Sequence, residues 1–219
     1  MPRTIATGDI TGLILAGGRG SRMGGVDKGL QPWRGQPLAL QVLHRLQPQV
    51  GPVLLNANRN LEVYRTWGLP VLPDVPPERN ARTPATSVEA PITVPQDYAG
   101  PLAGFLAGLG ACTTPYLLTA PCDSPLLPAD LAARLGAALL ARHARIALPR
   151  VGGRLQPVFC LMETGLRDDL RAFLQAGDRK IDLWTARHPT AIVDFDDLHA
   201  FENINTQGDL QRLDTTPSP

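Results

Sequence analysis

LILAGGRGSRMGGVDKGL, residues 13–30, is the stretch from which the fold of this chain is inferred. It begins inside a short apolar run, Ile10 to Ala16, that has the character of a buried β-strand. Six glycines then fall within thirteen positions, and Arg19, Arg22 and Lys28 stand among them. Glycine lets a ligand approach the main chain closely, and Arg and Lys supply donors suited to phosphate. The stretch therefore predicts a strand that leads into a polyphosphate-binding loop.

Two familiar phosphate loops do not fit these residues. The P-loop requires Lys and then Ser or Thr after its second glycine, but Val26 and Asp27 follow Gly25. The dinucleotide fingerprint requires a glycine five residues after Gly18, and Met23 stands there. Both motifs are disfavoured, so the loop belongs to another class of phosphate site.

Apolar runs and turn signals predict secondary structure along the rest of the chain. We expect buried strands at 10–16, 52–57, 71–72, 116–120, 145–148, 157–162 and 192–195. Helices are expected at 37–47, around Tyr64 and Trp67, at 101–109, from Pro128, at 166–174 and at 208–213. Because strands alternate with helices, the pattern predicts an α/β fold with a mostly parallel central sheet and helices on both faces.

One domain is expected across residues 1–219, with a loose leader at 1–9 and a frayed tail at 214–219. Residues 75–98 contain five prolines and little periodicity. Connections of this length are uncommon inside compact domains, so the segment predicts a flexible insertion.

Polar residues follow several of the predicted strands. Asn56 ends the second strand, Asp74 follows the third, and Asp123 follows the run Tyr116–Ala120. Ligands bind beyond the carboxyl ends of parallel strands, so these residues and the glycine loop should share one edge of the sheet. Each also has an ordinary interpretation, Asn56 and Asp74 as turn or loop residues and Asp123 as a turn residue that caps the next helix.

Asp123 is the candidate metal ligand. Magnesium binds few carboxylates and keeps substrate phosphates as its other ligands, so one aspartate that faces a phosphate loop suits Mg²⁺. Arg22 and Lys28 would neutralise phosphate charge there, although solvated surface charge is the usual fate of such residues. Asp27, beside Lys28, is expected to pair with a neighbouring base.

Composition narrows the class of protein. The chain is 43% apolar and carries a net charge of +1, which predicts a proper core and no general affinity for nucleic acid or membranes. No apolar stretch approaches membrane-spanning length, and no signal peptide is evident. Three cysteines without metal spacing fit a reduced, cytoplasmic compartment. Cys122 and Cys160 are expected to be small buried residues.

The loop also resembles a family signature, L-A-G-G-x-x-x-R-M-G-x-x-K, with one extra glycine, Gly25, between Gly24 and the last three positions, so that its lysine is Lys28. This signature is similar to that of nucleotidyltransferases that join a nucleoside monophosphate to a phosphorylated acceptor. The longer string RMGGVDKGL at 22–30 looks like the molybdenum cofactor guanylyltransferase family, which attaches GMP from GTP to molybdopterin. The resemblance covers most of residues 11–213, is weak at 145–200 and is absent at 75–98.

The resemblance implies a fold, a cofactor and site residues. The fold would be a Rossmann-like three-layer sandwich of the nucleotide-diphospho-sugar transferase type, with one antiparallel strand. Mg²⁺ would be the cofactor, held by Asp123, and Arg22, Lys28 and Asp123 would serve catalysis. The expected nucleotide contacts are Leu15, Ala16, Gly17, Gly18, Lys28, Asn56, Asp74 and Asp123.

The acceptor side and the partners are less specified. Gln156-Pro157 and Asn203–Thr206 resemble family segments near the acceptor, and Arg179-Lys180 would either meet its phosphate or end a helix. Transient contact with other molybdenum cofactor biosynthesis proteins or molybdoenzymes is implied. The alternatives are an enzyme that uses CTP with molybdopterin, an enzyme with a sugar-1-phosphate acceptor, and a non-catalytic GTP-binding module.

Overall fold

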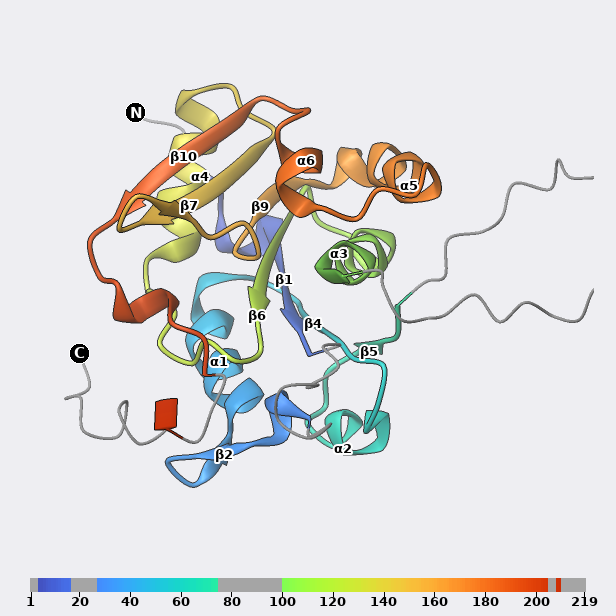
Figure 1. The fold of residues 1–219 in the computed structure, drawn as a ribbon, viewed down its shortest axis with the longest axis vertical. Coiled ribbons are helices and arrows are strands. Elements are labelled where there is room, and N and C mark those ends of the chain that lie inside the picture. Colours follow the sequence, from blue (N-terminus) through green and yellow to red (C-terminus); the bar gives the residue numbers. More distant parts are fainter. Residues whose placement is uncertain (1–3, 17–26, 75–99, 205–207, 210–219) are drawn as a thin grey trace, which may run out of the picture.

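An eight-stranded, mostly parallel sheet runs through this chain, whose computed structural model describes residues 4–16, 27–74, 100–204 and 208–209 (Figure 1). The strand order is β10-β7-β9-β6-β1-β4-β5, with β8 paired to β7. The strands of this sheet are β1 (Ile10–Leu15), β4 (Val53–Asn56), β5 (Val71–Leu72), β6 (Tyr116–Pro121), β7 (Ile146–Val151), β8 (Arg154–Leu155), β9 (Leu161–Glu163) and β10 (Thr190–Phe195). Only β8 and β9 run antiparallel to their neighbours in it. A separate antiparallel ribbon joins β2 (Pro32–Trp33) to β3 (Gln36–Pro37).

Helices cover both faces of the sheet. The described α-helices are α1 (Leu38–Leu46), α2 (Leu61–Arg65), α3 (Gly100–Ala111), α4 (Leu131–Ala141), α5 (Arg167–Gln175) and α6 (Ile181–Thr185). Single 3₁₀ turns lie at η1 (Thr7–Asp9), η3 (Lys28–Leu30), η4 (Gln47–Gln49), η6 (Thr164–Leu166) and η7 (His199–Phe201). Helices α1 and α4 pack on one face, and α3, α5 and α6 pack on the other.

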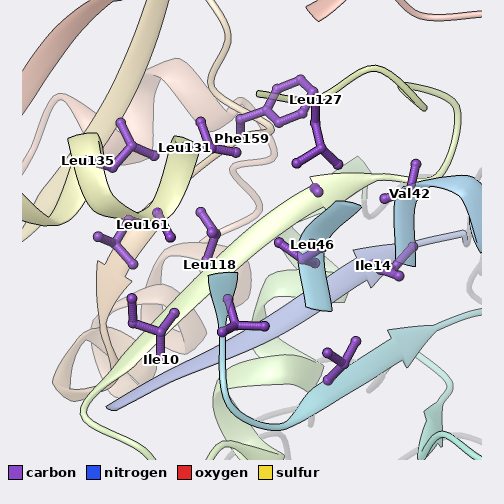
Figure 2. Packing of buried hydrophobic residues seen from close by; sticks show 14 of the residues in the cluster. Ile10, Ile14, Val42, Leu46, Leu118, Leu127, Leu131, Leu135, Phe159 and Leu161 are labelled. Atoms are coloured by element: carbon purple, nitrogen blue, oxygen red, sulfur yellow. The ribbon is translucent and has the colours of Figure 1, made fainter. Parts of the chain in front are cut away.

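Strand alternation divides the apolar side chains between two cores. Ile10 and Ile14 of β1 point toward α1 and α4, whereas Leu13 between them belongs to the core under α3 and α5. Figure 2 shows the first core, where Leu46 of α1 lies near Ile14, and Leu118 of β6 lies among side chains from several elements. Both faces of the central strands are therefore buried, which is why these strands read as unbroken apolar runs.

The predicted α/β architecture is confirmed, and most predicted elements lie within one or two residues of their expected bounds. The helix α6, the ribbon β2–β3 and the short strand β8 were not predicted. Residues 1–9 are not wholly loose, because η1 forms at Thr7–Asp9 and Ile5 packs against the first core.

The strand predicted at 157–162 is wrong over its first four residues, since β9 begins only at Leu161. Pro157 has no N–H to donate to a neighbouring strand. The chain turns instead, with Phe159 N–H bonded to Gln156 O, and the hydroxyl of Thr119 donates to Val158 O over 2.6 Å. An apolar sequence here fills the core without extending the sheet.

Several expectations fall outside the described residues. These are the glycine loop at 17–26, the insertion at 75–98, the tail at 214–219 and most of the terminal helix at 208–213. Within the described ranges, no helix has the length and apolarity needed to cross a membrane.

Leu118→Ala should lower the free energy of unfolding by about 2–5 kcal/mol, because it removes a fully buried side chain from the centre of the first core. The matched variant Leu183→Ala truncates a leucine that is 53% exposed on α6, and should change stability by less than about 0.5 kcal/mol. Urea unfolding measures both. Equal losses in the two variants would contradict this assignment of the core.

Candidate active site

The carboxyl ends of four neighbouring strands meet at one edge of the sheet. Leu15 ends β1 in register with Asn56 of β4 on one side and with Pro121 of β6 on the other. Ala16 is buried, and its N–H donates to Asn56 O over 2.7 Å. The backbone leaves β1 from a fixed position, and the next residues, including Gly17, Gly18 and Arg22, lie outside the described chain.

Lys28 and Asp123 lie together at this edge, although 95 residues separate them. Lys28 Nζ donates to Asp123 Oδ2 over 3.2 Å, and the two side chains are 22% and 13% exposed. Cys122 N–H bonds to Leu15 O, which fastens the segment before Asp123 to β1. Ile204 N–H donates to Asp123 O over 2.8 Å on its other side. A cation and a carboxylate are thus held on a fixed backbone and are partly open to solvent.

The donor set at Asp123 can be compared with what a metal ion requires. Asp123 Oδ1 accepts no hydrogen bond from the residues that the structure describes. No group of three or more His, Cys, Asp or Glu side chains able to hold a metal occurs in those residues. A cation here would take one carboxylate from the protein and its other ligands from phosphate and water, which is the coordination magnesium favours. The residues present therefore fit such an ion.

A second carboxylate, Asp27, anchors the turn that carries Lys28. It is only 6% exposed, and it accepts from Tyr64 Oη over 2.7 Å, from Asn60 Nδ2 over 3.0 Å and from Gly29 N–H over 3.1 Å. The expected basic neighbour is Arg59, whose Nε lies 3.8 Å from Asp27 Oδ2. Such a buried charge is stable only with several donors, so these contacts fix the backbone on both sides of Lys28.

Tyr64 and Cys122 complete the packing under this turn. Burial and the hydrogen bond to Asp27 raise the pKa of Tyr64 far above its usual value, so its hydroxyl remains a donor. Burial, assisted by the negative charges of Asp123 and Asp27, raises the pKa of the Cys122 thiol well above its usual value. Cys122 is a neutral buried residue, as expected, and burial raises the pKa of Cys160 as well.

Asn56 and Asp74 form a second pair at the ends of β4 and β5. The Asn56 amide donates to Leu72 O over 3.1 Å and to Asp74 Oδ1 over 2.9 Å. Asn56 is 2% exposed, and a Cβ on Gly104 of α3 would lie 2.5 Å from its Oδ1. Both amide hydrogens of Asn56 are therefore used inside the protein, whereas the Asp74 carboxylate is partly exposed.

Sequence reasoning missed two of these groups of contacts. Asn58 Nδ2 donates to Asp74 Oδ2 over 2.8 Å, and Tyr64 bonds to Asp27 across the fold. The run N-A-N-R-N at 56–60 carried a signal in its repeated amides, but nothing in the sequence pointed to Tyr64.

The residues expected near the acceptor lie at different places in the fold. Arg179 Nη1 donates to Leu174 O at the end of α5, so it ends a helix, as one of the two interpretations expected. Asn203 accepts from Ser124 Oγ over 2.5 Å, next to Asp123. Gln156 donates through its N–H to Pro149 O in the hairpin formed by β7 and β8.

Comparisons with known proteins agree on one family. The family model described as the MobA-like NTP transferase domain matches residues 12–191. A molybdenum cofactor guanylyltransferase of Ralstonia nicotianae is 56% identical over 218 residues, which cover 95% of this chain and 98% of the relative. The match includes Lys28, Asn56, Asp74 and Asp123 within its span.

Solved structures share the fold. Molybdopterin-guanine dinucleotide biosynthesis protein A from Archaeoglobus fulgidus has a TM-score of 0.69 at 20% identity, over 92% of this chain and 95% of that one. A Mycobacterium tuberculosis protein in complex with manganese has a TM-score of 0.64 at 14% identity, over 95% of this chain and 100% of that one. At these identities the likeness concerns the fold alone.

Tyr64→Phe should lower the free energy of unfolding by about 1–3 kcal/mol, because it removes a donor from the buried Asp27 carboxylate and leaves the ring in place. Tyr116→Phe is the matched control, since no described residue bonds to the Tyr116 hydroxyl, and should change stability by less than about 0.5 kcal/mol. Urea unfolding of the two variants and the parent makes the comparison. A Tyr64 variant as stable as the parent would mean that Asp27 does not depend on this bond.

Proposed function

The chain belongs to the MobA-like NTP transferase family of nucleotidyltransferases, and on that premise we propose that it transfers GMP from GTP to molybdopterin. The products are pyrophosphate and the guanine dinucleotide form of the molybdenum cofactor. The observation that carries the proposal is the Lys28–Asp123 pair, which lies at the same carboxyl edge of the sheet as Asn56 and Asp74. Charged groups for phosphate and polar groups for a base thus share one edge.

The reaction is a displacement at phosphorus. The terminal phosphate of molybdopterin attacks the α-phosphorus of GTP in line and forms a P–O bond. The bond from the α-phosphorus to the oxygen that bridges to the β-phosphate breaks, and pyrophosphate leaves. Because the attacking phosphate is already anionic, no protein nucleophile is required. Positioning and charge stabilisation supply most of the catalysis in such transfers.

Lys28 and Asp123 have complementary roles in this proposal. Without substrate, the ammonium group of Lys28 is paired with the Asp123 carboxylate over 3.2 Å. The triphosphate offers Lys28 a stronger set of acceptors, so Lys28 would stabilise negative charge on the phosphates and on the departing pyrophosphate. The buried contacts of Asp27 hold the turn in place, so the Lys28 ammonium group would meet the phosphates with little rearrangement of the backbone.

Asp123 would hold Mg²⁺. When bound, the ion neutralises phosphate charge and makes the α-phosphorus more electrophilic. A lone carboxylate beside a triphosphate would otherwise repel it, and Asp123 has one oxygen that the described residues leave without a hydrogen bond. The solved neighbour with manganese supports a divalent ion in this fold.

The remaining nucleotide contacts follow from position. Leu15 and Ala16, with Gly17 and Gly18 after them, would place backbone N–H groups near the phosphates, and Arg22 would add charge. Asp74 would form the base side of the pocket, and the buried amide of Asn56 would hold the Asp74 carboxylate in place. A carboxylate that accepts from an imide and an amino group favours guanine over cytosine.

Location and partners follow the same proposal. GTP and molybdopterin would be the small-molecule substrates, and the three free cysteines are consistent with a reduced, cytoplasmic compartment. Transient contact with other proteins of molybdenum cofactor biosynthesis, or with molybdoenzymes, would deliver the acceptor or remove the product.

Pyrophosphate release from GTP, CTP and UTP, each without an acceptor, with molybdopterin and with a sugar 1-phosphate, tests the function. We expect release only with GTP and molybdopterin together. Release with CTP and molybdopterin would favour an enzyme that uses CTP. Release only with a sugar 1-phosphate would show that the acceptor is a sugar phosphate and not molybdopterin. GTP binding without release under any condition would identify a binding module.

Lys28→Ala should lower turnover by about a hundredfold or more, because it removes the cation that faces the phosphates. Its effect on stability should stay within about 1 kcal/mol, since the ion pair is partly open to solvent. The control Arg171→Ala removes a cation from the exposed Asp168 pair on α5, and should leave turnover unchanged. Full activity of the Lys28 variant would place this lysine outside the site.

Asp123→Asn should fold normally, turn over about a hundredfold more slowly or worse, and require far more Mg²⁺ for half-maximal rate. The change keeps the shape of the side chain and removes the charge that would hold the cation. Rates are measured against Mg²⁺ concentration in the parent, in this variant and in Asp168→Asn, an exposed control on α5. If all three curves overlap, Asp123 is a turn residue and holds no metal.

A further inference from the structure

The carboxylate of Asp74 is held through both of its oxygens. Asn56 Nδ2 donates to Oδ1 over 2.9 Å, and Asn58 Nδ2 donates to Oδ2 over 2.8 Å. The backbone N–H of Asp74 in turn donates to Asn58 Oδ1 over 2.8 Å. Asn58 therefore bonds to Asp74 twice, once at the main chain and once at the carboxylate, and fixes the orientation of the acid.

Asn58 contributes little else to the fold. It is exposed in the loop between β4 and α2, whereas Asn56 is buried against Gly104. Hydrogen bonds between exposed groups replace bonds to water, so they add little to the free energy of folding. The consequence of the Asn58 contacts is thus the direction in which the Asp74 carboxylate faces.

The lone pairs that remain on Asp74 suit a particular ligand edge. An ionised carboxylate has about four acceptor positions, and the two asparagines occupy one on each oxygen. One acceptor per oxygen remains, which matches two adjacent N–H donors. Guanine presents such a pair in its ring N1–H and 2-amino group. Cytosine and adenine each place a ring acceptor beside their amino group, so they cannot satisfy both oxygens.

We propose that Asn58 is a specificity-determining residue, which positions the Asp74 carboxylate to accept from the N1–H and the 2-amino group of guanine. The inference rests on the proposed function, in which Asp74 contacts the base of GTP. Asn58 acts through Asp74 and touches no reacting atom. Its loss should therefore change the choice of nucleotide more than the fold.

Inosine triphosphate is the probe, because it differs from GTP only by lacking the 2-amino group. Titration calorimetry of the full chain with GTP and with ITP, both in Mg²⁺, gives the ratio of the two affinities. The parent should bind GTP about tenfold or more tightly than ITP, since one hydrogen bond to a charged acceptor is lost.

Asn58→Asp is the most specific variant. It keeps the shape of the side chain and the acceptor for Asp74 N–H, but a negatively charged oxygen replaces the donating amide and repels the Asp74 carboxylate. We expect the GTP-to-ITP affinity ratio to fall about fivefold or more, and Asn58→Ala to lower it as well. A residue with only a structural role would weaken both nucleotides alike and leave the ratio unchanged.

Two further variants separate the outcomes. Glu62→Gln, an exposed control on α2, should leave both affinities unchanged, and urea unfolding should show all variants folded. An unchanged ratio in both Asn58 variants, with a lowered ratio in Asp74→Asn, would overturn the role of Asn58 and keep Asp74 at the base. An unchanged ratio in Asp74→Asn too, or a parent that binds GTP and ITP alike, would remove Asp74 from the base site of the proposed function.

Discussion

A buried carboxylate in the turn that carries Lys28 is the constraint on which the site depends. Asp27 is 6% exposed, and a charge so placed is tolerated only where donors surround it. Those donors come from separate parts of the chain: Gly29 N–H from the same turn, Asn60 from the loop after β4, and Tyr64 from α2. Because all of them must meet at one carboxylate, the turn that carries Lys28 has one position relative to the sheet.

Close packing of glycines against functional side chains strengthens this constraint. A Cβ on Gly29 would lie 2.4 Å from Tyr64 Oη, and one on Gly104 would lie 2.5 Å from Asn56 Oδ1. What each position requires is space for a polar side chain to reach its partner. The backbone of α3 at Gly104 thus packs directly against Asn56, and the backbone of the Lys28 turn at Gly29 packs directly against Tyr64.

The sequence predicted the strands and the edge of the sheet that carries the site better than it predicted the hydrogen bonds between side chains. Buried parallel strands such as β1 and β6 are apolar runs, so both their place and the edge at which Lys28 and Asp123 meet could be inferred from local pattern. The strand expected at 157–162 was too long, because an apolar run shows burial and not pairing. The bonds of Tyr64 to Asp27 and of Asn58 to Asp74 could not be inferred, since each joins side chains that only the tertiary fold brings together.

The loop after β4 connects the two halves of the site. Asn58 bonds to Asp74, which is proposed to contact the base, and two residues later Asn60 bonds to Asp27, which holds the turn of Lys28. Asn60 has a φ of 52°, in the left-handed region that asparagine tolerates better than most residues, so the same side chain type permits the turn and supplies the donor. One short segment therefore bonds both to Asp74, which is proposed for base choice, and to Asp27, which holds the turn of Lys28. In the proposed function, a nucleotide that bonds to Asp74 would meet Lys28 in a fixed geometry, and binding energy gained at the base would then serve the orientation of the phosphates.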